Sequence, residues 1–411
     1  MARGARAART SREGTSGGAP PEAPSAAWEA FAYFHGSEED KATGLFRLVE
    51  EDGSASGAAL EWLAADDARR LYRGMLTVRV MDQRLMALQR QGRVGFYGEA
   101  AGQEAAVVGS AAALAPRDWL VPALREAGAG ILRGMSLSSY VAQIFGNDQD
   151  PGRGRQLPCH PCDRDTHYVV MSSCVGSQIP HAVGIAMGMK SAAAAGEGEP
   201  AVCMGYMGDG ATSEPDFHVA MNFAGVTRAP VVLVCQNNQW AISTPGSLQT
   251  AAPTIALKGI GYGIESLRVD GNDVCAVYLA SRYAVDKARR GGGPTFLELL
   301  TYRVSAHSSS DDPSRYRDET VTDVWREKRD PLRRMEALAA VRGWYAPGDT
   351  AALAESIEAE VRKVIAEQEA VGMPPIESLI EDVYEEPTWL LREQLDELAP
   401  HAAPGTERGN T

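Results

Sequence analysis

The feature that most constrains the fold of this chain is a pair of short apolar segments, each followed by a small polar cluster. Residues 201–207 (AVCMGYM) and 230–235 (PVVLVC) have the length and the unbroken apolar character of buried parallel strands. Residues 213–226 lie between them and fit one helix. A strand, a crossover helix and a second strand of this kind predict an α/β fold with a doubly wound parallel sheet.

Apolar periodicity predicts further elements on both sides of this unit. A helical spacing of apolar residues begins near Asp66, the expected N-cap, and continues through Met75 and Met81 to Leu85. After Pro331 the chain becomes charged and helical. The other elements that the pattern predicts are helices at 103–114, 178–195 and 351–370 and a strand at 296–302.

Composition divides the chain into one large domain, a helical section and two tails. Residues 1–40 begin with a stretch rich in Ala, Arg, Gly, Ser and Pro, which is typical of disorder. We expect the α/β domain to cover residues 41–345 and the helical section to cover 346–400. Residues 401–411 are expected to form a second disordered tail.

Charge and hydropathy exclude several classes of function. The 411 residues include 40 Lys and Arg against 54 Asp and Glu, and the net charge of −14 speaks against nucleic-acid binding. No apolar run approaches the roughly 18–20 residues that span a bilayer, so we expect a soluble protein with no membrane partner. The six cysteines are too sparse for a secreted disulfide scaffold, and we interpret Cys159 and Cys162 as incidental rather than as a redox or metal site.

Polar clusters follow both strands of the predicted unit. Gly208-Asp209-Gly210 follows the first strand, and Asn237-Asn238 follows the second after twenty-six intervening residues. Ligands of doubly wound sheets bind outside the carboxyl ends of strands, where these clusters fall. Asp209 and Asn238 offer hard oxygen ligands suited to Mg²⁺, and glycines before a helix N-terminus suit a diphosphate. Taken singly, each cluster could equally be an ordinary turn.

The pairing of these two clusters is the thiamin diphosphate motif, and the wider sequence supports that interpretation. From about Gly44 to Leu395 the chain resembles the α subunits of the decarboxylating component of 2-oxo acid dehydrogenase complexes. The resemblance implies a sheet of the thiamin diphosphate-binding type. The stretches that carry it are 124–128 (LREAG), 154–158 (GRQLP) with His160, 208–214 (GDGATSE), 236–245 (QNNQWAISTP) and 307–317 (HSSSDDPSRYR).

Thiamin diphosphate and Mg²⁺ are the cofactors that the resemblance implies, with a structural monovalent cation as a further one. Asp209, the side chain of Asn238 and the backbone carbonyl of Trp240 match the ligands of Mg²⁺. Arg125 matches a residue that contacts the diphosphate. The other positions expected against the cofactor are Ser173, Val175, Gly208, Gly210, Ala211 and His307.

The resemblance also assigns a substrate pocket and a catalytic histidine. His307 matches the histidine near the thiazolium ring that assists the reaction with the lipoyl group. Ser308 matches a serine that is phosphorylated in mitochondrial relatives. The positions expected to line the substrate pocket are Phe96, Leu124, Leu157, His160 and Ser173.

Three departures from the family pattern lie close to this site. Leu124 stands where many relatives have Tyr, Gln236 replaces an Arg of the mammalian proteins, and Ala306 occupies a position that is His in some members. The loss of the arginine weakens direct charge pairing with the diphosphate. None of the three changes a predicted Mg²⁺ ligand or His307.

The resemblance implies that the chain works with partners. In this family a glutamate from a separate pyrimidine-binding domain activates the cofactor. This chain has one thiamin diphosphate-binding βαβ unit and no room for that second domain. We therefore expect a β subunit in an α₂β₂ heterotetramer, a lipoyl-bearing acyltransferase as a further partner and a 2-oxo acid as substrate. A bacterial chain of this kind would be cytoplasmic, whereas a eukaryotic one would lie in the mitochondrial matrix.

The substrate is expected to be branched. Likenesses at 261–264 (GYGI), 268–274 (RVDGNDV) and 382–384 (DVY) favour the members that oxidise 3-methyl-2-oxobutanoate and its analogues in branched-chain amino acid degradation. A pyruvate or acetoin dehydrogenase α subunit shares the other motifs and remains an alternative. A non-catalytic thiamin diphosphate-binding paralogue is a third interpretation.

Overall fold

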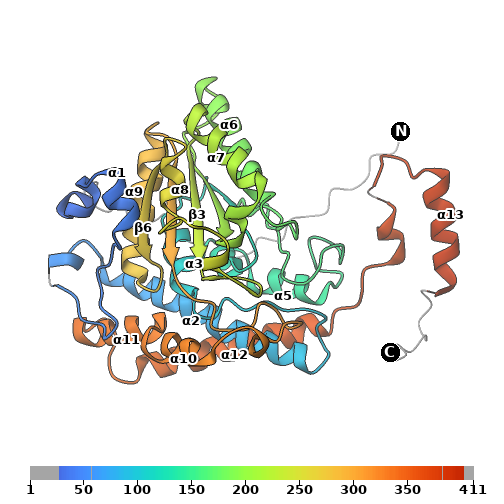
Figure 1. Cartoon of the computed structure of the whole chain (residues 1–411). Helices are drawn as coiled ribbons and strands as arrows, with labels where there is room; N and C mark the ends of the chain where they lie inside the picture. The colour runs from blue at the N-terminus through green and yellow to red at the C-terminus, as the bar shows by residue number, and fades with distance from the viewer. Residues whose placement is uncertain (1–26, 57, 382, 402–411) are drawn as a thin grey trace.

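A five-stranded parallel sheet forms the centre of the molecule (Figure 1). The computed structural model describes residues 27–56, 58–381 and 383–401. The strand order is β1-β2-β3-β7-β6, and each neighbouring pair is parallel. This confirms the predicted α/β fold on a parallel sheet. The strands are β1 (Trp119–Val121), β2 (Cys203–Gly208), β3 (Val231–Asn237), β6 (Glu265–Asp270) and β7 (Thr295–Leu300).

Helices cover both faces of the sheet because the chain crosses it in two directions. The crossover from β2 to β3 runs through α7 (Pro215–Thr227), whereas the return from β6 to β7 runs through α9 (Val274–Arg289). Right-handed crossovers in opposite directions place their helices on opposite faces. Side chains of β2 alternate accordingly: Cys203 and Met207 pack with α7, and Met204 and Tyr206 pack in the cluster that contains α9.

The predicted helices are present, with small differences at their ends. The segment that begins near residue 66 forms α2 (Ala65–Arg90), which lies below the sheet in Figure 1. The N-cap of α2 is Ala64. The prediction that Asp66 is the N-cap was therefore wrong. Asp66 lies in the first turn, where its carboxylate pairs with Arg69 at 2.8 Å and still interacts favourably with the helix dipole. The predicted helices 103–114 and 178–195 correspond to α3 (Glu104–Ala111) and α6 (Gln178–Ala194).

Residues 27–40 are folded, so the expectation that the disordered tail extends to residue 40 was wrong. Residues 27–43 form two short 3-10 helices and α1 (Glu38–Thr43). Trp28 and Phe34 are buried, and the ring of Phe34 lies 5.0 Å from Phe46 and 4.9 Å from Tyr283. These aromatic side chains bury enough apolar surface to offset the cost of ordering the segment. Residues 1–26, which carry the polar composition, lie outside the described residues.

The C-terminal section consists of helices, as expected. The helix predicted at 351–370 is α12 (Asp349–Glu369), which packs against α2 and α5 (Leu137–Phe145). The last helix, α13 (Trp389–Leu398), stands apart from the body of the molecule in Figure 1. Residues 382 and 402–411, which include part of the DVY likeness and the second predicted tail, lie outside the described residues.

The remaining elements are short or connect the larger ones. Among the described helices, none is both long enough and apolar enough to cross a lipid bilayer. The elements are α4 (Ala127–Leu132), α8 (Leu257–Ile260), α10 (Glu319–Lys328), α11 (Pro331–Arg342), the two-stranded β4 (Trp240–Ala241) and β5 (Thr244–Pro245), and 3-10 helices at Ala27–Ala30, Ala32–His35, Ala58–Leu60, Gly210–Ser213, Gly246–Leu248, Pro313–Arg315, Ile376–Leu379 and Ala399–His401.

The N-terminal segment should contribute measurably to stability. We expect Phe34→Ala to lower the free energy of unfolding by about 3–5 kcal/mol, the range for truncating a buried aromatic side chain. The neighbouring His35 is exposed, so His35→Ala should change the free energy by less than about 0.5 kcal/mol. Urea unfolding of both variants checks this, and equal stabilities would mean that the segment does not dock on the core.

Candidate active site

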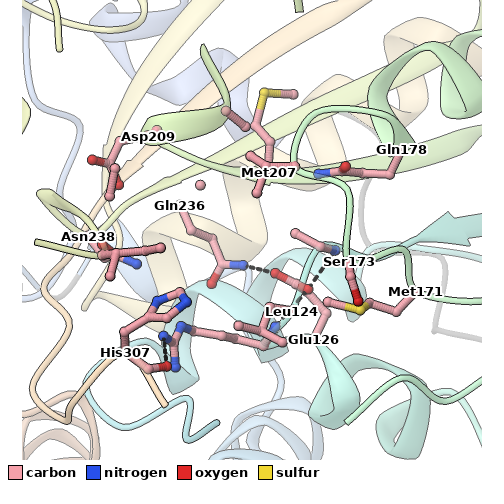
Figure 2. A pocket seen from close by; sticks show the side chains of 18 of the residues that line it. Leu124, Glu126, Met171, Ser173, Gln178, Met207, Asp209, Gln236, Asn238 and His307 are labelled. Carbon is pink, nitrogen blue, oxygen red and sulfur yellow. Dashed lines mark hydrogen bonds between the residues drawn. The ribbon is translucent and has the colours of Figure 1, made fainter. Parts of the chain in front are cut away.

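The predicted site residues meet in one cavity at the carboxyl ends of β2 and β3, with a volume of about 440 Å³. Figure 2 shows Asp209, Asn238 and His307 on one side of it and Ser173 and Met171 on the other. Each cofactor, metal, substrate and catalytic position expected from the sequence lines this cavity. They are Phe96, Leu124, Arg125, Leu157, His160, Ser173, Val175, Gly208, Asp209, Gly210, Ala211, Asn238, Trp240 and His307.

The glycines after β2 allow close approach to the backbone. β2 ends at Gly208, and a 3-10 turn begins at Gly210. A Cβ atom on Gly210 would lie 2.6 Å from the Cβ atom of Ala241, so the turn packs on β4 only with glycine there. A Cβ atom on Gly208 would meet no described atom within 4 Å, because that position faces the cavity. A side chain at Gly208 would therefore fill space that a ligand can use.

Asp209 presents an unpaired carboxylate oxygen to the cavity. The side chain is 2% exposed, and its Oδ2 accepts a hydrogen bond from Gln249 Nε2 at 2.9 Å. Its buried Oδ1 has no hydrogen-bond partner among the described residues. Burial raises the pKa of Asp209, and the bond from Gln249 opposes that shift. A buried carboxylate oxygen without a partner is costly unless a cation or a donor binds there.

Asn238 lies beside Asp209 at the end of β3 and is held by its neighbours. Its Nδ2 donates to Gln103 Oε1 at 3.0 Å, and its Oδ1 accepts from the backbone N–H of Trp240 at 3.2 Å. These two bonds fix the amide oxygen at the edge of the cavity. A carboxylate, an amide oxygen and a nearby backbone carbonyl form a ligand set typical of Mg²⁺.

Arg125 brings a buried positive charge to the same cavity. Its guanidinium donates to the carbonyl oxygens of Glu99 and His307, the latter at 2.8 Å. Within the described part of the chain, no carboxylate forms an ion pair with it. Burial lowers the pKa of Arg125 to about 10, and the nearby Arg303 adds to the shift. Neither Arg125 nor Arg303 forms an ion pair with a carboxylate of the described residues, and two such cations create a field that favours an anionic ligand.

His307 is neutral in this field. Burial lowers the pKa of His307 to about 4, and repulsion from Arg125 and Arg303 adds to the shift. The backbone N–H of His307 donates to Asp311 Oδ2 at 2.7 Å, which fixes the main chain of the loop. The ring lines the cavity, where a neutral imidazole can donate a proton at one nitrogen and accept one at the other.

A buried carboxylate at the cavity, that of Glu126, was missed by the sequence analysis. Glu126 is 1% exposed, and its Oε2 accepts from the backbone N–H groups of Ala123 at 2.8 Å and Arg125 at 3.0 Å. Its Oε1 accepts from Gln236 Nε2, as the dashed line in Figure 2 shows. Burial raises the pKa of Glu126 to about 7. The LREAG motif contains Glu126, but the motif alone gave no reason to separate it from the adjacent Arg125.

Three glutamines around the cavity also carry unpaired polar atoms. Gln103 Nε2, Gln178 Oε1 and Gln236 Oε1 are buried and have no hydrogen-bond partner in the described chain. Gln103 and Gln178 stand at the starts of helices, and this position in otherwise apolar segments is the signal that could have found them. The other lining residues that sequence reasoning missed are Ala123, Met171, Ser172, Met207, Glu214, Ala241 and Ile242.

His160 and Ser173 form a hydrogen-bonded pair on the far side of the cavity. His160 Nε2 lies 2.6 Å from Ser173 Oγ, and Nδ1 lies 3.0 Å from the carbonyl oxygen of Pro158. A carbonyl oxygen only accepts, so Nδ1 carries a proton and donates it to Pro158. The second ring nitrogen, Nε2, forms the hydrogen bond with the hydroxyl of Ser173.

Ser308 and the two cysteines of the CxxC stretch do not line the cavity. Ser308 is 6% exposed, and its Oγ accepts from the backbone N–H of Ser310 at 3.3 Å. Cys159 is buried, and burial raises the pKa of its thiol to about 12. Burial also raises the pKa of Cys162. Protonated thiols of this kind are poor nucleophiles and poor metal ligands.

Comparison with known proteins identifies the class of this site. Residues 72–377 match the family model described as dehydrogenase E1 component, and the chain belongs to this family.

Three curated relatives of the chain are named as alpha subunits of 2-oxoisovalerate dehydrogenase. The 2-oxoisovalerate dehydrogenase subunit alpha 2 of Arabidopsis thaliana is 39% identical over 360 residues, covering 87% of this chain and 75% of the relative. The alpha subunit of Dictyostelium discoideum is 39% identical over 337 residues, covering 82% and 75%. The human alpha subunit is 37% identical over 358 residues, covering 87% and 79%. All three are named as mitochondrial proteins.

The unpaired carboxylate of Asp209 should destabilise the ligand-free protein. The folded state raises the pKa of Asp209 above its unfolded value near 4, so stability falls as the pH rises and the folded carboxylate must ionise. We expect Asp209→Asn to raise the free energy of unfolding at pH 8 by about 1–3 kcal/mol, because a neutral amide costs less to bury than a carboxylate with an unpaired oxygen. Thermal unfolding with a chelator and no added cofactor measures this effect.

Asp273 provides a matched control for this prediction. It is equally buried, but its two oxygens accept four backbone N–H groups, from Leu48, Val49, Cys275 and Ala276. Although burial raises the pKa of Asp273 too, an amide there would place a donor against two donors. Asp273→Asn should therefore destabilise the protein. A loss of stability in Asp209→Asn as well would contradict the view that Asp209 lacks a partner.

Proposed function

We propose that this chain is the thiamin diphosphate-dependent α subunit of a branched-chain 2-oxo acid dehydrogenase. It acts on 3-methyl-2-oxobutanoate and its analogues and passes the acyl group to a lipoyl group. The observation that carries the proposal is the cavity at the strand ends, which joins an unpaired carboxylate oxygen of Asp209, the buried cation of Arg125 and the neutral His307. The names of the relatives supply the substrate class.

The charges of the cavity fit a magnesium diphosphate. Asp209 Oδ1 lacks a partner among the described atoms and would bind Mg²⁺ together with the amide oxygen of Asn238 and the carbonyl oxygen of Trp240. Arg125 would neutralise the remaining charge of the diphosphate, and Gly208 leaves the space its oxygens need. The Mg²⁺ shell would be completed by phosphate oxygens and water, which is typical of this ion. A structural monovalent cation stays a prediction from the resemblance.

Loss of the metal ligand should abolish tight cofactor binding. We expect Asp209→Ala to weaken the binding of thiamin diphosphate with Mg²⁺ by about 10²-fold or more, because removing one partner of a buried charge contact costs about 3–5 kcal/mol. Asp216→Ala, seven residues further on, removes an exposed carboxylate and should leave binding unchanged. Titration calorimetry on the assembled enzyme measures both, and unchanged binding in Asp209→Ala would refute this assignment.

The residues of the chain prepare the site for decarboxylation and acyl transfer. Thiamin diphosphate, when bound, supplies the nucleophilic carbon and the electron sink that removal of CO₂ from a 2-oxo acid requires. Arg125 and Arg303 attract the anionic substrate as well as the diphosphate. The His307 ring can deliver a proton to a sulfur atom leaving the lipoyl disulfide, and an anion bound nearby would raise the pKa of His307 and ease this transfer.

The apolar part of the cavity lining suits a branched aliphatic side chain. Phe96, Leu124, Leu157 and Met171 give it an apolar lining. Leu124 in place of tyrosine makes this side less polar. Each of the two extra methyl groups of 3-methyl-2-oxobutanoate gains free energy in such a pocket, which favours this substrate over pyruvate.

The position of Ser308 would allow its modification to control the loop that carries His307. It directly follows His307 and is buried in this conformation, so a kinase could reach it only after the loop had moved. A phosphate there would add nearly two negative charges and three acceptor oxygens beside a site that binds anions. We propose Ser308 as a modification site on this basis.

Exposed apolar surface supports the proposed β subunit. Around the cavity, Leu157, Val175 and Ile242 are 60%, 61% and 53% exposed, although they flank the site of the chemistry. An apolar rim of this kind suits coverage by another chain. The partner would also supply the glutamate that the pyrimidine ring of the cofactor requires, and the acyltransferase would bring the lipoyl group to the assembled site.

One assay tests the proposed function directly. The chain alone should not turn over any 2-oxo acid, whereas the chain assembled with its β subunit should decarboxylate 3-methyl-2-oxobutanoate with a kcat/KM roughly 10–200-fold above that for pyruvate. An artificial electron acceptor reports the first half-reaction, and lipoylated acyltransferase reports the second. A preference for pyruvate or acetoin would support the alternative enzymes. Cofactor binding without turnover of any 2-oxo acid would indicate a non-catalytic paralogue.

A further inference from the structure

A buried carboxylate on α2 is hydrogen-bonded to the loop that contributes Phe96 to the cavity. Asp82 is 3% exposed, and its Oδ1 accepts from the hydroxyl of Tyr97 at 2.7 Å. Its Oδ2 accepts from the backbone N–H of Ala100, also at 2.7 Å. Asp82 forms no ion pair in the described part of the chain. The carboxylate of Asp82 thus fixes the loop at two residues, Tyr97 and Ala100, which lie three positions apart in the sequence.

The loop that Asp82 fixes carries part of the site. Residues 96–102 place the ring of Phe96 against the cavity. The carbonyl oxygen of Glu99 in the same loop accepts from the guanidinium of Arg125. Gly102 ends the loop with φ near +90°, where a Cβ atom would lie 2.5 Å from the carbonyl oxygen of Tyr302. The loop therefore packs directly on the segment that leads to His307.

Several hydrogen bonds join this loop to the His307 segment. The backbone N–H of Ser309 donates to the carbonyl oxygen of Tyr97 at 2.8 Å, and the N–H of Tyr97 donates to Ser309 Oγ at 3.1 Å. Arg125 connects the carbonyl oxygens of Glu99 and His307. Tyr97 thus bonds to Asp82 through its side chain and to the His307 segment through its main chain.

We propose that Asp82 and Tyr97 are positioning residues that hold the His307 segment at the cavity through the 96–102 loop. Neither residue lines the cavity, so both act through other residues. A buried carboxylate with no ion-pair partner lowers stability compared with an apolar side chain of similar size. Its presence beneath a functional loop is therefore explained better by placement of that loop than by stability. The value of this placement for catalysis rests on the proposed function, whereas the placement itself does not.

The charge of Asp82 should control how firmly the loop is held. Burial raises the pKa of Asp82 to about 7, the bonds from Tyr97 and Ala100 oppose the shift, and Glu99 and Glu104 add to it. The other groups that face it are Tyr140, Cys159 and Arg125, and burial keeps the tyrosine and the thiol neutral at this pH. Ionised Asp82 makes two charge-assisted hydrogen bonds, which weaken when it takes up a proton. The loop should therefore be held more firmly at pH 8 than at pH 6.

Amide hydrogen exchange of the full chain, assembled with its β subunit, tests the proposal. In Tyr97→Phe and Asp82→Asn, exchange over residues 304–312 at pH 8 should speed up by about tenfold or more. The control is Tyr72→Phe, which removes a partly buried tyrosine–carboxylate hydrogen bond between the same helix α2 and Glu336 on α11, away from the cavity. This variant should leave exchange over 304–312 as in the wild type.

The pH dependence gives a second, independent readout. After correction for the intrinsic effect of pH on exchange, the wild type should protect residues 304–312 better at pH 8 than at pH 6. Asp82→Asn should abolish this difference, because no charge remains to titrate at that position. Wild-type exchange in Tyr97→Phe, or equal acceleration in Tyr72→Phe, would overturn the proposal. Tyr97→Phe decides the matter even where Asp82→Asn does not fold.

Activity measurements then separate this proposal from the proposed function. In the assembled enzyme, Tyr97→Phe should lower kcat for acyl transfer to the lipoyl group about tenfold, with KM for the 2-oxo acid nearly unchanged. A wild-type enzyme without 2-oxo acid activity would refute the proposed function, and the exchange result would still decide whether Asp82 and Tyr97 position the segment.

Discussion

The guanidinium of Arg125 is the group on which the arrangement of the site depends. It is buried, it donates to the carbonyl oxygens of Glu99 and His307, and it has no carboxylate partner in the described part of the chain. An arginine does not lose its proton in a protein, so this charge persists whether or not a ligand is bound. The guanidinium of Arg125 therefore holds two loops in place, and its positive charge remains available to bind an anion. Burial lowers the pKa of His307, and the same field lowers it further.

The sheet explains why these groups meet. Because β2 and β3 are parallel neighbours, their carboxyl ends lie at one edge, and Asp209 and Asn238 follow them directly. The strands themselves are packed between two helical layers and cannot shift without disturbing both cores. The loops that carry Arg125 and His307 come from other parts of the chain and are joined to this edge by hydrogen bonds. A rigid edge with adjustable loops is a common way to build a ligand site.

The parts that could be predicted from the sequence are those with a local pattern. β2, α7 and β3 follow from unbroken apolar runs and turn residues, and the motifs located the cavity because both follow a strand. The folded structure of residues 27–40 could not be predicted from composition, because it depends on the packing of Phe34 against Tyr283, which lies far along the chain. Glu126, Gln103 and Gln178 were missed for a related reason. A single buried polar residue has no periodicity, and only the fold shows which of its atoms lack partners.

The arginine that the resemblance implies for mammalian relatives at the position of Gln236 would give the site a different charge. Gln236 donates to Glu126 through an amide, so Glu126 is not neutralised by a cation at that position, and burial raises its pKa to about 7. An arginine at position 236 would favour the ionised form of Glu126 and would form an ion pair with it. Much of the positive charge of that arginine would then be neutralised by Glu126. With glutamine there, Glu126 can take up a proton near neutral pH and leave Arg125 and Arg303 with their full charge. The site thus remains attractive to an anion with one arginine fewer.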